Sequence, residues 1–224
     1  ANGHYVINGT KTYISNAPEA GVLVTLATRD KSEGYKGIDA LIVDGDLDGI
    51  EVNQLHGKMG VRASTVGEIV FKNCHVPVHN RLGEESVGFR QTMEVLNASR
   101  ISIAAQCVGI AQAALEESVQ YARTREVFGG PLGDLQAIQW MIADMATETE
   151  AARQLVMSVA SKRDAGVSFL TEASMAKLFA SRVAMQAANN AVQIHGGAGY
   201  FAPTKVERLF RDARVTEIYE GTSE

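Results

Sequence analysis

The spacing of the apolar residues changes once along the chain, near residue 86, and this change constrains the fold more than any other feature. Before it, short runs rich in β-branched residues are separated by Gly, Asp and Asn; the runs read VLVTLATRD, IDALIVD, GIEVNQ and GEIVFKN. Several strands at this spacing without long helices between them predict an antiparallel barrel or sandwich. The Asn8-Gly9 pair between HYVI and KTYISN predicts a hairpin turn, and Pro77 predicts the end of the strand region.

After the change, apolar residues recur at helical spacing over two long stretches. The stripes are Phe89, Met93, Leu96, Ile103, Cys107 and Ile110, then Ile138, Met141, Met145, Ala152, Leu155 and Val159. A third helix is predicted from about Thr171 to Ile194, with breaks at FGGPLGD and KRDAGVS. Long helices joined by short loops predict an up-and-down bundle, and strands followed by helices indicate an α+β fold. We therefore divide the chain into a β domain over residues 1–83 and a helical domain over residues 84–224.

Composition and charge argue against several functional classes. The 224 residues carry 21 basic and 26 acidic side chains, a net charge of −5, which argues against binding to nucleic acid or an anionic membrane. We find no apolar run long enough to span a bilayer and no signal-like N-terminus. Cys74 and Cys107 are the only cysteines, and they indicate a reduced intracellular compartment and no metal site. The opening ANGHYVINGTK begins within a turn and strand pattern without Met, which is typical of a fragment of a longer chain.

Arg100 interrupts an apolar stripe. It shares a predicted helix face with Leu96, Ile103 and Cys107, where an unpaired guanidinium would be costly. It therefore needs an anionic or polar partner, such as a protein carboxylate or a ligand phosphate or carbonyl. An internal ion pair or the edge of a stripe that reaches water explains the position equally well.

Two glycine-rich segments follow predicted helices. RTREVFGGPLGDLQ places Arg125 and Phe128 beside two glycines, and QIHGGAGYF spans residues 193–201. Glycines let the backbone approach a ligand, Arg pairs with phosphate and an aromatic ring stacks on a ring, although a helix C-cap or a sharp corner has the same composition. The second segment lacks the spacing of a dinucleotide fingerprint, and we interpret His195 as a packed, hydrogen-bonded residue.

The stretch TYISN places Tyr13 and Ser15 on the same side of a predicted strand by the two-residue period. An aromatic ring with a neighbouring hydroxyl could flank a flat ring system. A plain barrel surface would look the same.

Taken together, these stretches resemble the acyl-CoA dehydrogenase family. The matching segments are YVINGTKTYISN, KGIDALIVD, KMGVRAS, FGGPLGDLQAIQ, ADMATETEAAR, SMAKLFAS, AVQIHGGAGY and RLFRDARVTEIYEGTSE. The resemblance covers essentially the whole chain and implies a middle β-barrel domain followed by a C-terminal four-helix domain. The family's N-terminal helical domain and the helix after GTSE are expected outside this sequence. RISIAAQCVGIAQAAL and DARVTEIYEGTSE look closest to short-chain or short-branched-chain members.

The resemblance implies an FAD-dependent enzyme of β-oxidation that converts an acyl-CoA thioester to the trans-2-enoyl thioester. The α-proton needs a carboxylate in a dry pocket, and the thioester carbonyl needs hydrogen-bond donors. In many members the base is the Glu of YEGT, here Glu220, whose own backbone N–H is one donor, and the β-hydride passes to N5 of FAD. The alternative base position is Ser99 here, which cannot serve. An electron-transferring flavoprotein is the implied acceptor of the electrons. Two alternative functions stay open, an acyl-CoA oxidase and a non-catalytic binding or assembly protein. Cyclic or aromatic acyl-CoA substrates also stay open.

The resemblance also implies ligand contacts, position by position. The FAD contacts are Tyr13, Ser15, Arg125, Phe128, Gln136, Gln193, Gly196, Gly197 and Thr222, and the substrate contacts are Asn97, Arg100, Tyr219 and Gly221. The contacts in the two glycine-rich regions would reach the FAD of a neighbouring subunit, which implies a homo-oligomer, expected as a dimer of dimers. The implied location is a bacterial or archaeal cytoplasm, or the mitochondrial matrix.

Overall fold

The computed structural model describes residues 3–223 and divides into two units, Ala1–Val95 and Leu96–Glu224. Strands make up the regular structure of the first unit apart from short 3₁₀ turns and the first turns of one helix, and long helices dominate the second. This order confirms the predicted α+β class. The domain boundary at residue 83 stays a prediction.

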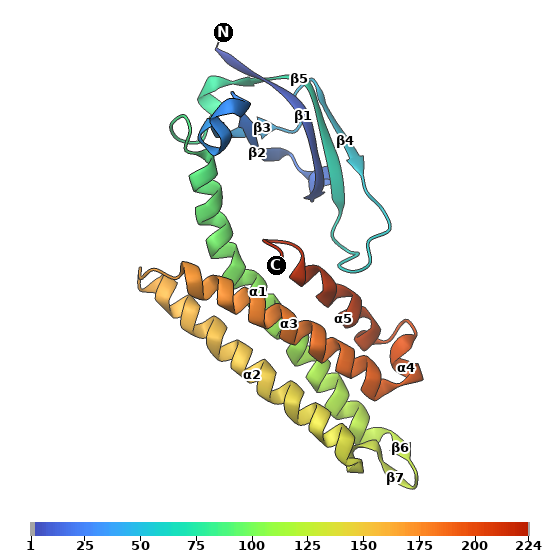
Figure 1. The fold of residues 1–224 in the computed structure, drawn as a ribbon. Helices are drawn as coiled ribbons and strands as arrows, with labels where there is room; N and C mark the ends of the chain where they lie inside the picture. Colours follow the sequence, from blue (N-terminus) through green and yellow to red (C-terminus); the bar gives the residue numbers. More distant parts are fainter. Residues whose placement is uncertain (1–2, 224) are drawn as a thin grey trace. The chain divides into compact units, whose positions relative to one another are not determined.

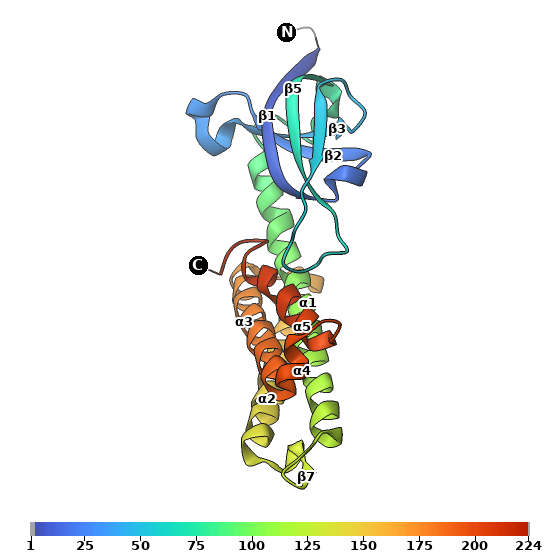
Figure 2. The same ribbon diagram turned by 90° about the vertical axis from the view of Figure 1, so that its right-hand side faces the viewer.

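Unit 1 contains two antiparallel sheets. Strands β1 (His4–Ser15), β5 (Val66–Pro77) and β4 (Ile50–Gln54) form one sheet in that order, and β2 (Val22–Thr28) pairs with β3 (Ile38–Asp44) (Figure 2). Buried side chains from both sheets form one core: Ile7, Leu23, Leu41, Val43, Ile69, Phe71, Cys74 and Val76. Two sheets that share a core make a sandwich, one of the two predicted forms, and no closed barrel occurs within the described residues.

The predicted hairpin at Asn8-Gly9 is wrong. Strand β1 runs through this pair, and its register with β5 shifts between Ile7 and Gly9. Gly9 has a φ of 146°, and the Asn8 side-chain oxygen accepts a hydrogen bond from the Asn73 N–H at 2.8 Å. The dipeptide's conformational freedom therefore serves a β-bulge rather than a turn. The predicted end of the strand region at Pro77 is confirmed.

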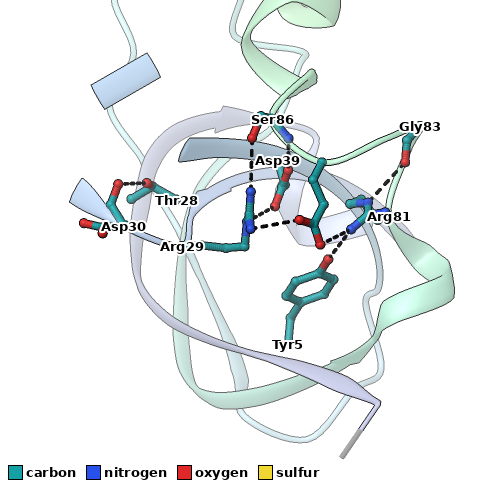
Figure 3. Close-up of polar contacts among 9 residues, drawn as sticks. Tyr5, Thr28, Arg29, Asp30, Asp39, Arg81, Gly83 and Ser86 are labelled. Atoms are coloured by element: carbon teal, nitrogen blue, oxygen red, sulfur yellow. Dashed lines mark hydrogen bonds and ion pairs between the residues drawn. The ribbon is translucent and has the colours of Figure 1, made fainter. Parts of the chain in front are cut away.

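A polar cluster, which we name the Asp39 cluster, comprises Asp39, Arg29 and Ser86 (Figure 3), together with Glu85, which pairs with Arg29. The Asp39 side chain is 2% exposed and accepts from Arg29 Nε at 2.8 Å and from the Ser86 N–H at 2.7 Å. Arg29 also contacts Glu85 at 3.1 Å, and Arg81 donates to the same carboxylate at 2.9 Å. These bonds fix the segment that leads from the sheets into the first long helix.

Unit 2 is built around three long helices joined by short connections (Figure 1). The elements are α1 (Gly88–Thr124), whose first turns belong to unit 1, β6 (Glu126–Val127), β7 (Gly130–Pro131), α2 (Gln136–Asp164), α3 (Leu170–His195), α4 (Gly197–Tyr200) and α5 (Lys205–Arg214). Helix directions alternate from α1 to α3, and the short α5 packs against α3. The breaks predicted at FGGPLGD and KRDAGVS, and the bounds of the third helix, are confirmed.

Alanine makes up most of the buried face of α3, which also includes Ser181, Val183 and Ile194. Ala173, Ala176, Ala180, Ala184, Ala187, Ala188 and Ala191 are each at most 2% exposed. Such small side chains let neighbouring helices approach closely, here α2 on one side and α5 on another. One long charged residue, Lys177, lies on the same buried face.

Candidate active site

The chain reverses direction after α5 in a turn that we name the Glu220 turn, residues 217–223. The N–H groups of Ile218 and Tyr219 donate to the Val215 carbonyl at 2.9 and 3.0 Å, and the Ser223 N–H donates to the Glu217 carbonyl at 3.0 Å. Glu220 has a φ of 54° and Gly221 a φ of 95°. A left-handed backbone at a residue with a side chain is strained by about 1 kcal/mol or more, so neighbouring groups must hold Glu220 there.

The Glu220 carboxylate is held by a serine from α1. Ser99 Oγ donates to Glu220 Oε2 at 2.5 Å, and both residues are half-buried. A hydroxyl bond to a carboxylate is short and stronger than one between neutral groups. Sequence reasoning considered Ser99 only as a failed base, and the structure gives it a different place as the partner of the carboxylate.

A second contact reaches the Glu220 turn from α3. Lys177, which is 4% exposed, donates from Nζ to the Gly221 carbonyl oxygen at 2.6 Å. Sequence reasoning did not single out Lys177. The available signal was a charged residue on a face otherwise lined mostly by alanine.

Arg100 lies beside the same turn, on α1. Its Nη1 donates to Ser174 Oγ at 3.0 Å and to Asn97 Oδ1 at 3.3 Å, so within residues 3–223 its partners are neutral oxygens and not the carboxylate that was one predicted partner. Arg100 is half-buried, which agrees with a stripe edge that reaches water. A Cβ added to Gly221 would lie 3.4 Å from Arg100 Nη2, and the positive φ also favours glycine at this position.

These groups surround a pocket of about 210 Å³. Its lining residues are Arg100, Ser174, Lys177, Leu178, Gly221, Thr222 and Ser223. Ser223 Oγ is buried and has no hydrogen-bond partner within the described residues. Two cationic side chains and an available hydroxyl suit a polar ligand that carries negative charge.

Tyr219, within the turn, is half-buried, and Cys107 on α1 is fully buried. The Tyr219 hydroxyl donates to Gln106 Oε1 at 2.7 Å, and burial raises the pKa of Tyr219, so its hydroxyl is neutral near pH 7. Burial likewise raises the pKa of the fully buried Cys107 thiol, which makes it a poor nucleophile.

Both glycine-rich segments lie away from the Glu220 turn, in a region where α1 and α3 contact each other (Figure 1). The Tyr121 ring on α1 stacks on His195 at the end of α3, with ring centroids 4.2 Å apart, and His195 Nδ1 bonds the Ala191 carbonyl at 2.8 Å. The interpretation of His195 as a packed residue is confirmed. Six predicted FAD contacts are exposed in this region: Arg125, Phe128, Gln136, Gln193, Gly196 and Gly197.

Several of these groups have features that suit a bound nucleotide. The Phe128 ring is 97% exposed on a residue with a φ of 52°, which places a large apolar ring in solvent. Cβ atoms added to Gly196 and Gly197 would meet nothing within 4 Å, so the backbone there is open to a ligand. From Ser99 to Tyr121 the α1 axis rises about 33 Å. The Glu220 turn and the glycine-rich end are therefore well-separated regions of the same chain.

In unit 1, Tyr13 is 79% exposed and has a φ of 58°, and Ser15 is exposed near the end of β1. The register between β1 and β5 shifts between Lys11 and Ile14. This irregularity interrupts the two-residue alternation on which the same-side prediction rested. The flavin contacts of both residues stay predictions.

Comparison with known proteins gives this arrangement a family. Residues 1–74 match the acyl-CoA dehydrogenase middle domain, and residues 86–224 match the acyl-CoA dehydrogenase C-terminal domain. The chain belongs to the acyl-CoA dehydrogenase family, as its sequence motifs predicted.

The similar proteins are named for different activities. The chain is 48% identical over 220 residues to acryloyl-CoA reductase (NADH) of Anaerotignum propionicum, covering 98% of this chain and 56% of that protein. It is 45% identical over 221 residues to subunit CarC of the caffeyl-CoA reductase-Etf complex of Acetobacterium woodii, covering 99% and 59%. Butyryl-CoA dehydrogenase from Megasphaera elsdenii has a similar structure, with a TM-score of 0.97 at 42% identity, covering 100% of this chain and 58% of that one.

The chain thus spans less than two thirds of the length of each of these relatives. Within residues 3–223, no helix combines the length and apolar character needed to cross a membrane. The same part of the chain holds no group of three His, Cys, Asp or Glu side chains arranged for a metal ion.

Proposed function

We propose that this protein removes the α-proton and the β-hydride of an acyl-CoA thioester, with Glu220 as the base. The observation that carries this proposal is the Glu220 carboxylate, held by Ser99 at 2.5 Å in a turn that borders the pocket lined by Arg100 and Lys177. Membership of the acyl-CoA dehydrogenase family supports it. A carboxylate positioned this way can accept a proton from a carbon next to a carbonyl, which general-base catalysis requires.

The residues of the turn divide the work between proton transfer and charge stabilisation. Glu220 accepts the α-proton, and Ser99 holds the carboxylate until substrate arrives. The Glu220 N–H donates to no acceptor within the described residues, so it is available to the thioester carbonyl, where negative charge develops. Arg100, with its guanidinium beside the pocket, is suited to the phosphates of the CoA portion.

FAD fits the exposed groups described above: the Phe128 ring for stacking, Arg125 for phosphate and the open backbone at Gly196 and Gly197. When bound, FAD would supply the acceptor for the β-hydride and pass the electrons to an electron-transferring flavoprotein. The CarC relative, which is part of a reductase-Etf complex, supports such a partner.

The separation of the two sites within one subunit supports a homo-oligomer. About 33 Å along α1 exceeds the length of an extended flavin adenine dinucleotide. The glycine-rich end of one subunit would therefore bind the FAD that serves the Glu220 turn of its neighbour. A dimer of dimers, working in a bacterial or archaeal cytoplasm or the mitochondrial matrix, is the form we propose.

The proposed substrate is a short-chain or short-branched acyl-CoA, supported by the similarity to butyryl-CoA dehydrogenase. A second candidate function is the reverse reaction, reduction of a 2-enoyl thioester. It is favoured by the two relatives that are named as reductases, one of which acts on an aromatic acyl group by its name. In that direction protonated Glu220 would deliver the α-proton.

The test records the visible flavin absorption of the holoenzyme before and after anaerobic addition of butyryl-CoA. We expect the flavin band to bleach. Glu220→Gln should retain its flavin and bleach about 10²- to 10⁴-fold more slowly, the range that a general base contributes. Glu148→Gln, on the exposed surface of α2, is the matched control and should bleach at the wild-type rate.

The outcomes separate the alternatives. Bleaching at the wild-type rate in Glu220→Gln would contradict the assigned base. Fast reoxidation of the reduced flavin by oxygen would indicate an oxidase, and a band that persists with butyryl-CoA but bleaches with 3-phenylpropionyl-CoA would indicate an aromatic substrate. Reoxidation of chemically reduced enzyme by crotonyl-CoA, faster than butyryl-CoA bleaches it, would favour the reductase. A purified protein without any flavin band would favour a non-catalytic relative.

A further inference from the structure

Lys177 is a buried cation whose place in the bundle needs an explanation. It lies on α3 among Ala173, Ala176 and Ala180, all at most 1% exposed, while Lys177 itself is 4% exposed. The small neighbours leave room for its long aliphatic stem. Burial of an ammonium is costly unless hydrogen bonds replace its water, so the group is retained only where its partners are fixed. One of those partners is the Gly221 carbonyl oxygen, 2.6 Å from Nζ.

The Gly221 carbonyl belongs to the most strained part of the Glu220 turn. Two successive left-handed residues, Glu220 at φ 54° and Gly221 at φ 95°, form its apex. The hydrogen bonds within the turn join its two ends, through the Ser223 N–H to Glu217, and leave the apex unsupported. Conformations of this kind persist only when surrounding structure determines them.

Two contacts from the helices hold this apex. Ser99 on α1 reaches the Glu220 side chain, and Lys177 on α3 reaches the backbone one residue later. The nearby guanidinium of Arg100 is bonded to Ser174 and Asn97 instead. Lys177 is thus the contact from the bundle that fixes the orientation of the peptide group that follows Glu220.

We propose that Lys177 is a positioning residue for the base, acting through the Gly221 carbonyl. The ammonium keeps Gly221, and with it Glu220, in the left-handed conformation. This aims the carboxylate and the Glu220 N–H at the α-carbon and the carbonyl of the same thioester. Without it, the apex relaxes toward ordinary negative φ and both groups move together. The inference rests on the proposed role of Glu220 as base.

The test replaces Lys177 by Met, which preserves the volume of the stem and removes the donor. Steady-state kinetics of the holoenzyme with butyryl-CoA are measured beside the isotope effect for substrate deuterated at the α-carbon. We expect kcat to fall about 10- to 100-fold, because a displacement of about 1 Å can lower a rate by that factor. The KM should stay within about threefold and the α-deuterium effect should rise, because proton abstraction becomes more rate-limiting.

Lys205→Met is the matched control. Lys205 is another lysine of unit 2, partly exposed and paired with Glu117 at 2.9 Å, outside the site. It should leave kcat, KM and the isotope effect unchanged. Lys177→Arg keeps a cationic donor and should recover part of the lost kcat.

Three results would overturn the proposal. The first is a wild-type kcat and isotope effect in Lys177→Met. The second is a loss of kcat in Lys177→Met that equals its loss of flavin, with an unchanged isotope effect. The third is a Lys177→Arg variant as impaired as Lys177→Met. If Lys177→Met does not fold, Lys177→Gln decides, since a raised isotope effect supports the role and an unchanged one refutes it. Absence of bleaching in the wild type would refute the proposed dehydrogenation itself, whereas a bleaching wild type with an unimpaired Lys177→Met variant would refute only the role of Lys177.

Discussion

Replacement of Asp39 by Ala is expected to destabilise unit 1 without touching the candidate active site. The carboxylate is 2% exposed and accepts two hydrogen bonds, from Arg29 Nε at 2.8 Å and the Ser86 N–H at 2.7 Å. Loss of a hydrogen bond to a charged group costs about 1.5–3 kcal/mol. The Arg29 side chain is 37% exposed and can regain water, so the change stays below the roughly 3–5 kcal/mol of a fully buried pair. We expect a loss of about 2–3 kcal/mol.

Hydrogen exchange is the suitable assay because it reports each unit separately. The only tryptophan, Trp140, lies in α2, so fluorescence would report the helical unit instead. A loss of about 2–3 kcal/mol should accelerate exchange of the most protected β3 and β5 amides roughly 30- to 140-fold, since each 1.4 kcal/mol is a factor of ten. Amides of α2 should exchange as in the wild type. Glu51→Ala, which removes an exposed pair with Lys72, is the control and should change nothing measurable. Equal exchange in the Asp39 and Glu51 variants would refute the reasoning.

Two further predictions concern the Glu220 turn. Ser99→Ala removes the 2.5 Å bond to the carboxylate and should lower kcat for butyryl-CoA about tenfold at unchanged flavin content, because a charge-assisted bond contributes at least about 1.4 kcal/mol; an unchanged kcat would show that the bond does not position the base. Tyr219 has a pKa raised by burial above the ordinary value of about 10, so its contribution to stability is complete below pH 10 and is lost as the pH rises through the folded-state pKa. The free energy of unfolding, measured by urea titration with Trp140 fluorescence, should therefore fall less steeply above pH 10 in Tyr219→Phe than in the wild type. Parallel pH profiles of the two proteins would contradict this account.

Local patterns in the sequence predicted the elements of the fold, but pairing between distant strands was not predictable. The third helix, expected from about Thr171 to Ile194, spans Leu170–His195, because helical periodicity is contained in the segment itself. The Asn8-Gly9 pair failed as a hairpin because the same backbone freedom serves a turn or a bulge. The choice is made by β5, where Gly9 pairs with Phe71 far along the chain.

In the candidate site too, local sequence features were predictable and contacts between distant residues were not. The YEGT motif identified Glu220, and the break in an apolar stripe identified Arg100. The bond from Ser99 spans 121 residues and the bond from Lys177 spans 44, so no local pattern could reveal which group either side chain contacts. Lys177 interrupts its alanine face as Arg100 interrupts its own stripe, and the same argument applied to α3 would have found it.

The alanine face of α3 also limits how this protein can evolve. At the buried alanine positions a larger side chain would push α2 or α5 outward. The Glu220 turn follows α5 through a short 3₁₀ turn, Val215–Glu217, and a shift of that helix would move the carboxylate while most of the bundle remained folded. Substitutions on the buried face of α3 would thus alter the catalytic turnover before they unfold the protein. Sequence variation in this helix should accumulate at its exposed positions, such as Met175 and Arg182.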